Sequence, residues 1–446
     1  MHKTIQHHTL VDFIIMKRTS ILPVLCILAL CSCSSKAEFD QEPVKHDALA
    51  DYWESGYSGP VGLQAGNVSG VPTILLAGLP LYVTGINCYD LFNGDLSPSG
   101  HSNAWHRQVV ERLDANEVPI VRFNCGVFSA EEFGAYYDSA LKAQYLDCLE
   151  DLAAQCDEKH ILLIPSFFWN YAAIPEYFEE APLLESGVRN YSVWGNPDSK
   201  TYQMMLDYTK EVVNVLKGHK CIAAWEFGNE LNLAADLYKK DTSCNEIYAE
   251  DVFTAYKGFA SKVKSLDSSG RIICTGNSIM RNNQYNRWKS GTTTKDTFAQ
   301  YVDVAAAFTP GDMLGMSEHI YDGETRAFKD YGTVSRDTQL DLALRCARQS
   351  GKVYYVGEFT GPAGTAASTG GPDAVKSHLD SYLKNKIQIS LVWNYAMTCN
   401  VEWSFSETQI VRSVGGVREI TESDYGAKTF EAMRTLNAEF KALDEK

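Results

Sequence analysis

The sequence predicts an α/β fold, a (β/α)8 or TIM barrel with long loops at the C-terminal face of its strands. Between positions 81 and 394, eight short apolar runs alternate with longer amphipathic segments. Each run is bounded by polar or glycine-rich sequence and is typical of a strand buried on both faces. A doubly wound open sheet is the rival fold, but no GxGxxG turn follows the first run.

The expected elements follow one another in strict alternation. Strands are expected at 81–88, 118–124, 161–167, 221–227, 271–276, 313–319, 353–358 and 387–394. Helices are expected near 104–116, 141–158, 200–217, 246–266, 295–308, 337–350 and 373–385, with a last one at 425–442. The helical period is visible in one apolar stripe formed by Met204, Leu206, Val212, Val213 and Leu216.

The N-terminal segment has the layout of an export signal. A basic start, Lys17-Arg18, precedes an apolar run from Ile21 to Leu30, which is too short to cross a bilayer as a helix. The run ends in Leu30-Cys31-Ser32-Cys33 and resembles the lipobox of bacterial lipoproteins, which implies cleavage before a lipidated Cys33. An ordinary cleaved signal is the alternative.

Three segments are expected along the chain. Residues 1–32 are an over-extended start plus the signal peptide, 33–65 are a lipidated tether and lead-in, and 66–446 are the barrel domain. Within the last segment, Gly66–Pro80 is expected to form a hairpin that closes one end of the barrel. The protein is therefore expected to be exported and held at a membrane, at the outer membrane or cell surface, through its lipid anchor alone.

Composition and charge exclude several classes of protein. The net charge of −16 makes the chain a poor candidate for binding nucleic acid through phosphate contacts. Downstream of Cys33 the cysteines are scattered singly, with no CxxC or Cys/His metal spacing. Four of them, at positions 88, 125, 221 and 274, fall in or beside apolar runs and are expected in the core. No metal, no cofactor and no disulfide framework is expected, and the sequence leaves the oligomeric state open.

Eight aromatic residues lie between positions 167 and 194, directly after the third expected strand. Loops at strand C-termini are where barrel enzymes bind ligands, so these rings are candidates for contact with a substrate. A loop that packs its own small core is the alternative for most of them. Trp169 is the best candidate for an exposed ring, because it lies nearest the end of the strand.

Two carboxylates lie at the C-terminal tips of expected strands. The fourth strand ends in Trp225-Glu226-Phe227-Gly228-Asn229-Glu230, and the seventh ends in Gly357-Glu358-Phe359. Two carboxylates facing across a site can cleave a glycosidic bond, one as acid and the other as nucleophile or base. Glu226 lies mid-strand, where it would support the site from within the barrel. Glu318, near the sixth tip, is expected on the opposite face.

These motifs resemble retaining glycoside hydrolases of clan A, most closely family 5. The first segment is similar to the family's W-E-x-x-N-E strand and the second to its nucleophile strand. The resemblance covers about residues 66–442. It implies Glu230 as general acid/base, Glu358 as nucleophile and Asn229 as a ligand of the sugar 2-hydroxyl. Because neighbours on a regular strand point to opposite faces, Asn229 and Glu230 require an irregular strand end, which Gly228 would ease.

Five further residues extend the resemblance. Arg122 matches an arginine near the nucleophile, where a cation favours the ionised carboxylate. His319 and Tyr321 match an H-x-Y motif, in which Tyr321 would bond Glu358 and His319 would contact substrate. A core histidine is the alternative for His319. Trp393 matches the tryptophan floor beneath the sugar. For Asn87, in a G-x-N motif, a structural role is at least as plausible.

The departures from the family concern the substrate. Leu231 replaces the usual proline after the acid/base, and Ser166-Phe167-Phe168-Trp169-Asn170 is similar to the endo-β-mannanase branch. The expected substrate is therefore β-1,4-mannan, with β-glucan next. Exo-acting glycosidases and transglycosylases share these residues, and a lipoprotein that binds glycan without turnover is a further alternative. The glycine-rich segment 360–372 could form a lid or a passive loop.

The expected reaction is double displacement with retention of configuration. Glu358 would attack while Glu230 protonates the leaving sugar, so the pKa of Glu230 is expected to be raised. The two carboxyl groups are expected about 5–5.5 Å apart, since inverting enzymes need a wider gap for water.

Overall fold

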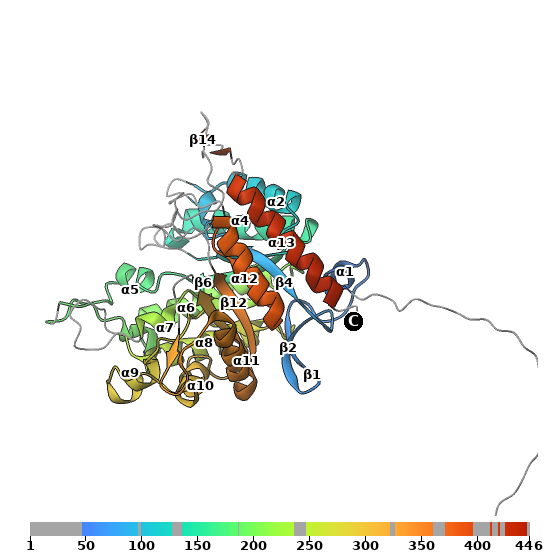
Figure 1. Cartoon of the computed structure of the whole chain (residues 1–446). Coiled ribbons are helices and arrows are strands. Elements are labelled where there is room, and N and C mark those ends of the chain that lie inside the picture. The colour runs from blue at the N-terminus through green and yellow to red at the C-terminus, as the bar shows by residue number, and fades with distance from the viewer. Residues whose placement is uncertain are drawn as a thin grey trace, which may run out of the picture. The chain divides into compact units, whose positions relative to one another are not determined.

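The eight expected barrel strands form a closed parallel barrel (Figure 1). The computed structural model describes residues 47–96, 100–126, 136–185, 187–235, 247–321, 326–359, 371–395, 411–412, 418–419 and 424–443. The expected signal peptide, Cys33 and most of segment 360–372 lie outside the described residues. Nothing in the structure therefore bears on the export signal or the lid.

The barrel strands follow one another in chain order, and every neighbouring pair is parallel. The last strand pairs with the first in register, Ile389 opposite Val83, and this closes the cylinder. The predicted fold class is confirmed. The strands are β4 (Val83–Asn87), β5 (Ile120–Asn124), β6 (Leu162–Phe168), β7 (Trp225–Gly228), β8 (Ile273–Cys274), β9 (Gly315–Ile320), β12 (Val353–Phe359) and β13 (Ile389–Val392).

The expected helices are all present. They are α2 (Ala104–Ala115), α4 (Ser139–Glu158), α6 (Lys200–Leu216), α8 (Ala249–Leu266), α10 (Phe298–Ala307), α11 (Arg336–Ser350), α12 (Gly371–Asn385) and α13 (Asp424–Leu443). Several begin at a polar cap: the side chain of Ser199 accepts from the N–H of Tyr202, and Thr297 and Gln300 form a capping box. The apolar stripe of α6 is buried except for Leu206, which is half-buried.

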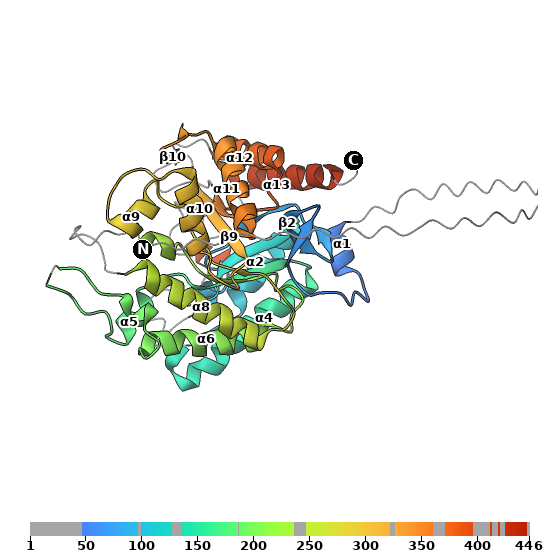
Figure 2. The same cartoon turned by 90° about the horizontal axis from the view of Figure 1, so that it is seen from below.

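Short elements that the sequence did not predict lie in the loops. They are α5 (Ala173–Tyr177), α7 (Leu231–Ala234), α9 (Gln284–Ser290), the pair β10 (Ala327–Phe328) and β11 (Gly332–Thr333), the pair β14 (Val411–Arg412) and β15 (Arg418–Glu419), and two 3-10 turns, η1 (Asn93–Asp95) and η2 (Ser192–Gly195). In Figure 1, α5, α7 and α9 lie at one end of the barrel, and Figure 2 shows α5 and α9 at the same end. This end carries the C-termini of the strands.

The other end of the barrel is closed by the chain that precedes the first barrel strand. The expected hairpin is present as β1 (Gln64–Val68) and β2 (Val71–Leu76), extended by β3 (Leu79–Pro80). A helix that was not expected, α1 (Ala48–Trp53), lies at the same end. Ile74 and Leu76 belong to one buried cluster with residues of the barrel interior. This cluster occupies the half of the barrel that lies away from the C-termini of the strands.

The cysteines behave as expected for small core residues. Cys88, Cys125, Cys221 and Cys274 are buried, and the seven cysteines of the described residues are all free thiols. No helix in the described part of the chain is both long enough and apolar enough to span a membrane.

Removing one hydroxyl is expected to weaken the closure of the barrel. The hydroxyl of Tyr52 donates to the carbonyl of Lys220 at 2.6 Å and accepts from the N–H of Gly62 at 2.9 Å. Tyr52→Phe leaves these groups without a partner and is expected to lower the free energy of unfolding by about 1–3 kcal/mol. Urea unfolding measures the change. Tyr57→Phe is the matched control, because its hydroxyl bonds Pro60 in an exposed position, and it is expected to shift the value by less than about 0.5 kcal/mol.

Candidate active site

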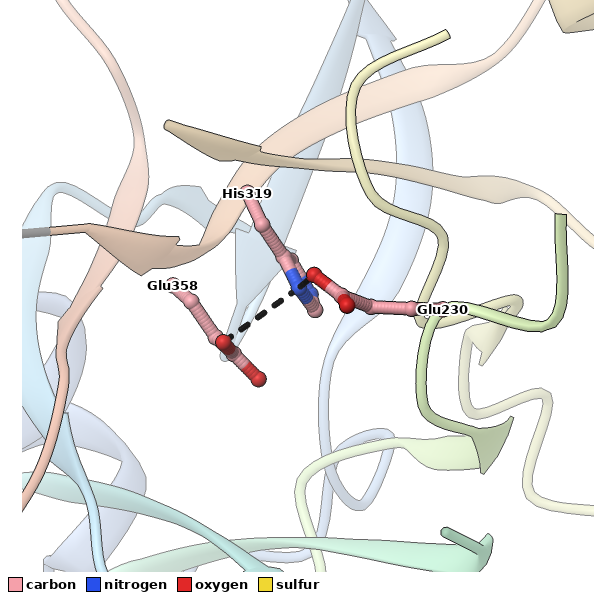
Figure 3. Close-up of side chains that lie close together, drawn as sticks. All are labelled: Glu230, His319 and Glu358. Atoms are coloured by element: carbon pink, nitrogen blue, oxygen red, sulfur yellow. Dashed lines mark hydrogen bonds and ion pairs between the residues drawn. The ribbon is translucent and has the colours of Figure 1, made fainter. Parts of the chain in front are cut away.

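The two strand-end glutamates meet across the barrel axis, with a histidine between them (Figure 3). Nδ1 of His319 lies 2.8 Å from Oε1 of Glu230 and 3.4 Å from Oε2 of Glu358. One oxygen of each carboxylate and one ring nitrogen lie within 4.8 Å of one another. Glu230 follows β7, His319 lies on β9 and Glu358 lies on β12, so three parts of the barrel bring their side chains to one point. The separation of the two carboxylates is compatible with the about 5–5.5 Å of retaining glycosidases and is shorter than the separation in inverting ones.

Arg122 lies beneath this pair and is fully buried. Its Nε donates to Oε1 of Glu226 at 2.7 Å, and its NH1 donates to Oε1 of Glu358 at 2.7 Å. The guanidinium also donates to the amide oxygen of Asn87 at 2.9 Å and to that of Asn229 at 2.8 Å. A guanidinium buried without such partners would be very costly, so the arrangement fixes the position of all four side chains.

Glu226 supports the site from inside the barrel, as its mid-strand position predicts. It is fully buried, and its second oxygen accepts from the hydroxyl of Tyr355 at 2.6 Å. Glu318 lies on the opposite face of its strand, where it accepts from the hydroxyls of Tyr301 and Tyr354. The other two glutamates are therefore the ones available for chemistry.

Tyr321 and Asn87 contact the site in different ways. Tyr321 donates to Oε2 of Glu358, the contact that the resemblance implies. Asn87 has the structural role: besides accepting from Arg122, it donates to the carbonyls of Gly357 and Leu391 at 2.9 and 3.2 Å. It thereby links β4 to β13, its neighbour in the barrel, and to β12, the next strand along.

His319 is more deeply placed than expected of a residue that contacts substrate. Its side chain is fully buried, and its Nε2 finds no hydrogen-bond partner among the described residues. The reason is that its other nitrogen is directed between the two carboxylates. Its observed contacts are with Glu230 and Glu358, and the expected contact of His319 with substrate stays a prediction.

Trp393, the expected floor residue, belongs to a small buried cluster with Trp169 and Tyr89. Trp393 and Trp169 pack with ring centroids 6.0 Å apart, and Tyr89 meets Trp169 edge-on at 5.1 Å. The expectation that Trp169 is exposed is wrong: it is only 7% exposed. The guanidinium of Arg122 covers it at 4.3 Å from the ring centroid, because Trp169 directly follows β6, and β6 pairs with β5, which carries Arg122.

Most of the other aromatic residues between 167 and 194 pack into a core of their own. Phe167, Phe168, Tyr191 and Trp194 are all buried. Tyr171 is half-buried instead. Tyr177 and Phe178 are half-buried as well. The alternative of a self-packed loop is therefore the better description of this segment, with these three rings at its edge.

The strand end at Glu230 is irregular, but Gly228 is not the residue that bends. Glu230 itself has the left-handed conformation, with φ 51° and ψ 27°, and its N–H donates to the carbonyl of Gly276 at 2.8 Å. Gly228 is needed for close approach, since a Cβ there would lie 2.2 Å from the carbonyl oxygen of Phe168. A Cβ on Gly276 would lie 1.8 Å from the carbonyl oxygen of Gly228. A left-handed conformation at a non-glycine residue is strained, and such strain is typical of functional sites.

The pKa values of the two glutamates shift in opposite directions. Burial raises the pKa of Glu230, but the hydrogen bond and charge of His319, together with a hydrogen bond from Ser278 and the charge of Arg122, outweigh it, so the pKa is lowered. Burial also raises the pKa of Glu358, and here the attraction of His319 and Arg122 does not compensate. The expected raised pKa of Glu230 is therefore wrong for the ligand-free site, because His319 bonds Glu230 at shorter range.

A cavity of about 500 Å³ opens beside Glu230. Its walls come from three loops: residues 169–171 after β6, residues of the segment 229–234 after β7, and Arg281 after β8. Such a volume lies within the range of about 300–1,000 Å³ of small-molecule sites. Sequence reasoning missed Arg281, which carries no motif and lies in an irregular segment.

Glu230, His319 and Glu358 are also the one group among the described residues whose ligand atoms are close enough to hold a metal ion. Each of these atoms already takes part in an ion pair within the group. The same Glu358 also accepts from Arg122 and Tyr321, and a nearby arginine opposes the binding of a cation. The set is better suited to exchanging a proton than to coordinating a metal.

The fold is shared with solved glycoside hydrolases. An endo-1,4-β-mannanase from Rhizomucor miehei matches at 16% identity and a TM-score of 0.56, over 85% of this chain and 99% of that one. A family 5 mannosidase from the same fungus matches at 12% identity and 0.53, over 87% and 100%. The β-mannanase of the blue mussel Mytilus edulis matches at 12% and 0.52, over 85% and 97%. No protein-family model matches the chain, and no curated protein does. At these identities, the likeness establishes the barrel fold alone.

Replacing the two glutamates by glutamine is expected to change the free energy of unfolding in opposite directions at pH 7. The raised pKa of Glu358 means that its ionisation destabilises the fold at pH 7, so Glu358→Gln is expected to raise the free energy of unfolding. The lowered pKa of Glu230 means that its ionisation stabilises the fold above the unfolded pKa of about 4.3, so Glu230→Gln is expected to lower the free energy of unfolding. Urea unfolding at pH 7 measures both changes.

The same measurement at low pH is the control. The contribution of Glu230 is lost as the pH falls through its folded pKa, and Glu358 is then neutral in both states, so both differences are expected to shrink. Changes of equal sign at pH 7 would contradict the opposite shifts.

Proposed function

We propose that this chain is a retaining glycoside hydrolase that cleaves O-glycosidic bonds of β-1,4-mannan by double displacement. The observation that carries the proposal is the spacing of Glu230 and Glu358: one carboxylate oxygen of each residue and a ring nitrogen of His319 lie within 4.8 Å of one another. Arg122 and Tyr321 both bond Glu358, which holds the nucleophile in one orientation. Trp393 packs against Tyr321 in a small buried aromatic cluster, and we assign it the floor beneath the sugar because of its match to the family's eighth-strand tryptophan.

The reaction begins when a Glu358 oxygen attacks the anomeric carbon. The bond to the leaving oxygen breaks as Glu230 donates its proton to that oxygen, and a glycosyl-enzyme forms. Glu230 then takes a proton from water, the water oxygen attacks the same carbon, and Glu358 leaves. No metal or cofactor enters either step.

Glu230 must carry a proton at the start, and His319 offers a route for it. In the ligand-free site the pKa of Glu358 is raised and that of Glu230 is lowered, which favours the proton on Glu358. Nδ1 of His319 contacts both carboxylates, so it can release a proton to Glu230 and take one from Glu358. Substrate that displaces water from Glu230 would favour this transfer, because desolvation raises the pKa of a carboxyl group.

Mannan is preferred to glucan as substrate for two reasons. The loop that carries Trp169 and Asn170 is similar to the endo-β-mannanase branch of family 5. In addition, solved structures with the same fold include proteins described as endo-1,4-β-mannanase and β-mannanase. An endo-β-1,4-glucanase with the same catalytic residues is the second candidate.

Alanine variants of the two glutamates test the chemistry. Glu358→Ala and Glu230→Ala are each expected to lower kcat on mannan by at least about 10²–10⁴-fold, because each removes a group that acts in the transition state. Reducing-sugar release from mannan, glucomannan, xylan and β-glucan measures both activity and substrate range. Glu150→Ala, an exposed change on α4, is the control and should retain activity.

Two outcomes would contradict the proposal. Full activity in either variant would show that the carboxylates are wrongly assigned. An NMR time course that shows the inverted anomer as first product would exclude double displacement.

We also propose that the barrel is exported and held at a membrane through a lipidated Cys33, which rests on the lipobox-like sequence alone. Cys33→Ser is expected to move the protein from the membrane fraction to the soluble fraction of the host cell, since anchoring requires acyl chains. Fractionation with an antibody against the barrel measures this. Equal membrane retention of the variant would contradict the anchor.

A further inference from the structure

A tyrosine of the apolar half of the barrel reaches into the polar network of the catalytic end. Tyr355 lies on β12, and its buried ring belongs to the same cluster as Ile74 and Leu76. Its hydroxyl donates to Oε2 of Glu226 at 2.6 Å. Burial raises the pKa of Tyr355 well above its usual value, so the hydroxyl keeps its proton and acts as a donor near neutral pH.

The two oxygens of Glu226 serve two different donors. Oε2 accepts from Tyr355, and Oε1 accepts from Nε of Arg122 at 2.7 Å. The terminal nitrogens of the guanidinium bond other residues: Nη1 donates to Glu358 at 2.7 Å, and Nη2 donates to Asn229 at 2.8 Å. Glu226 thus holds the guanidinium through Nε alone, whereas a carboxylate and a guanidinium frequently pair through two parallel bonds.

The second bond of such a pair would fall on the nitrogen that Asn229 uses. Nε and Nη2 lie side by side on one edge of a guanidinium, so a carboxylate that offers both oxygens to this edge takes both nitrogens. Glu226 is fully buried, and an Oε2 without the hydroxyl would have neither that donor nor bulk water. Turning toward Arg122, which the same carboxylate already contacts, would satisfy it.

We propose that Tyr355 is a positioning residue for the reaction, because its hydroxyl keeps Glu226 from taking both Nε and Nη2 of Arg122. The guanidinium then stays divided, with Nη2 on Asn229 and Nη1 on Glu358. The proposal rests on the glycosidase function proposed above. Tyr355 acts through the guanidinium on the expected ligand of the sugar 2-hydroxyl and on the nucleophile.

Removing the hydroxyl is expected to slow the reaction more than it weakens binding. In Tyr355→Phe, Glu226 turns to bond Nε and Nη2, and Asn229 loses its anchor. Hydrogen bonds to the sugar 2-hydroxyl strengthen in the transition state, so their loss lowers kcat more than it changes KM. On mannopentaose, kcat is expected to fall about 10–100-fold while KM changes less than about threefold. Cellopentaose is the parallel substrate for a glucan-specific enzyme.

Tyr354→Phe is the matched control for the loss of a buried hydroxyl. Tyr354 precedes Tyr355 on β12 and is also buried, but its hydroxyl donates to Glu318 at 3.2 Å, outside the catalytic network. The hydroxyl of Tyr301 donates to the same carboxylate, which therefore keeps a donor in the variant. Tyr354→Phe should leave kcat unchanged. Equal losses of kcat in the two variants would overturn the positioning role.

A double-mutant cycle tests whether the effect passes through Glu226. In Glu226→Gln the side chain has a single acceptor oxygen and cannot take both Nε and Nη2 of Arg122. Adding Tyr355→Phe to this variant is therefore expected to change kcat by less than about threefold. If the losses of the two single variants multiply instead, Tyr355 acts by another route and the proposal is wrong.

A crystal structure of Tyr355→Phe separates this proposal from the proposed function. The expected structure has both oxygens of Glu226 on Arg122 and the amide of Asn229 turned away from Nη2. An ordered water on Oε2, with all bonds of Arg122 unchanged, would overturn the positioning role. A wild-type protein that turns over neither pentaose would overturn the proposed function, whereas the crystal structure decides the role of the hydroxyl with or without turnover.

Discussion

Arg122 carries a positive charge into the barrel interior with its side chain fully buried, and four side chains from three other strands compensate it. Removing a charge from water costs several kcal/mol unless hydrogen bonds replace the lost hydration, so the positions of Glu226, Glu358, Asn87 and Asn229 are all constrained together. The geometry of the catalytic end follows from this one requirement. Glu358 is placed by Arg122, and the strand end that carries Glu230 is placed by the neighbouring Asn229.

A second consequence is electrostatic. Arg122 forms ion pairs with both Glu226 and Glu358, and Glu358 in turn faces Glu230 across His319, so the four acidic and basic groups around His319 are electrostatically coupled. Two carboxylates this close cannot both be ionised without cost, and a histidine between them lowers that cost. In the ligand-free site the opposite pKa shifts favour the proton on Glu358, whereas the proposed reaction requires it on Glu230.

The two ends of the barrel contribute differently to stability and function. One end is closed by the chain before β4, whose Ile74 and Leu76 complete an apolar core, and this end contributes stability. The other end carries the polar network, the left-handed Glu230 and the cavity lined by Tyr171 and Arg281. Strained backbone and buried charge at that end are tolerated because the apolar half offsets their cost.

The sequence by itself determined the barrel, because eight apolar runs and eight amphipathic segments have periods that admit few other arrangements. It also placed Glu230 and Glu358 at strand tips, since position along a strand fixes which end a residue reaches. Which side chains meet across the axis was decided only by the tertiary structure. Trp169 looked exposed from its place after a strand, yet Arg122, distant in sequence, covers it. The direction of the pKa shift of Glu230 depends on a 2.8 Å contact with His319, and burial and distance of this kind arise only when the strands close into a barrel.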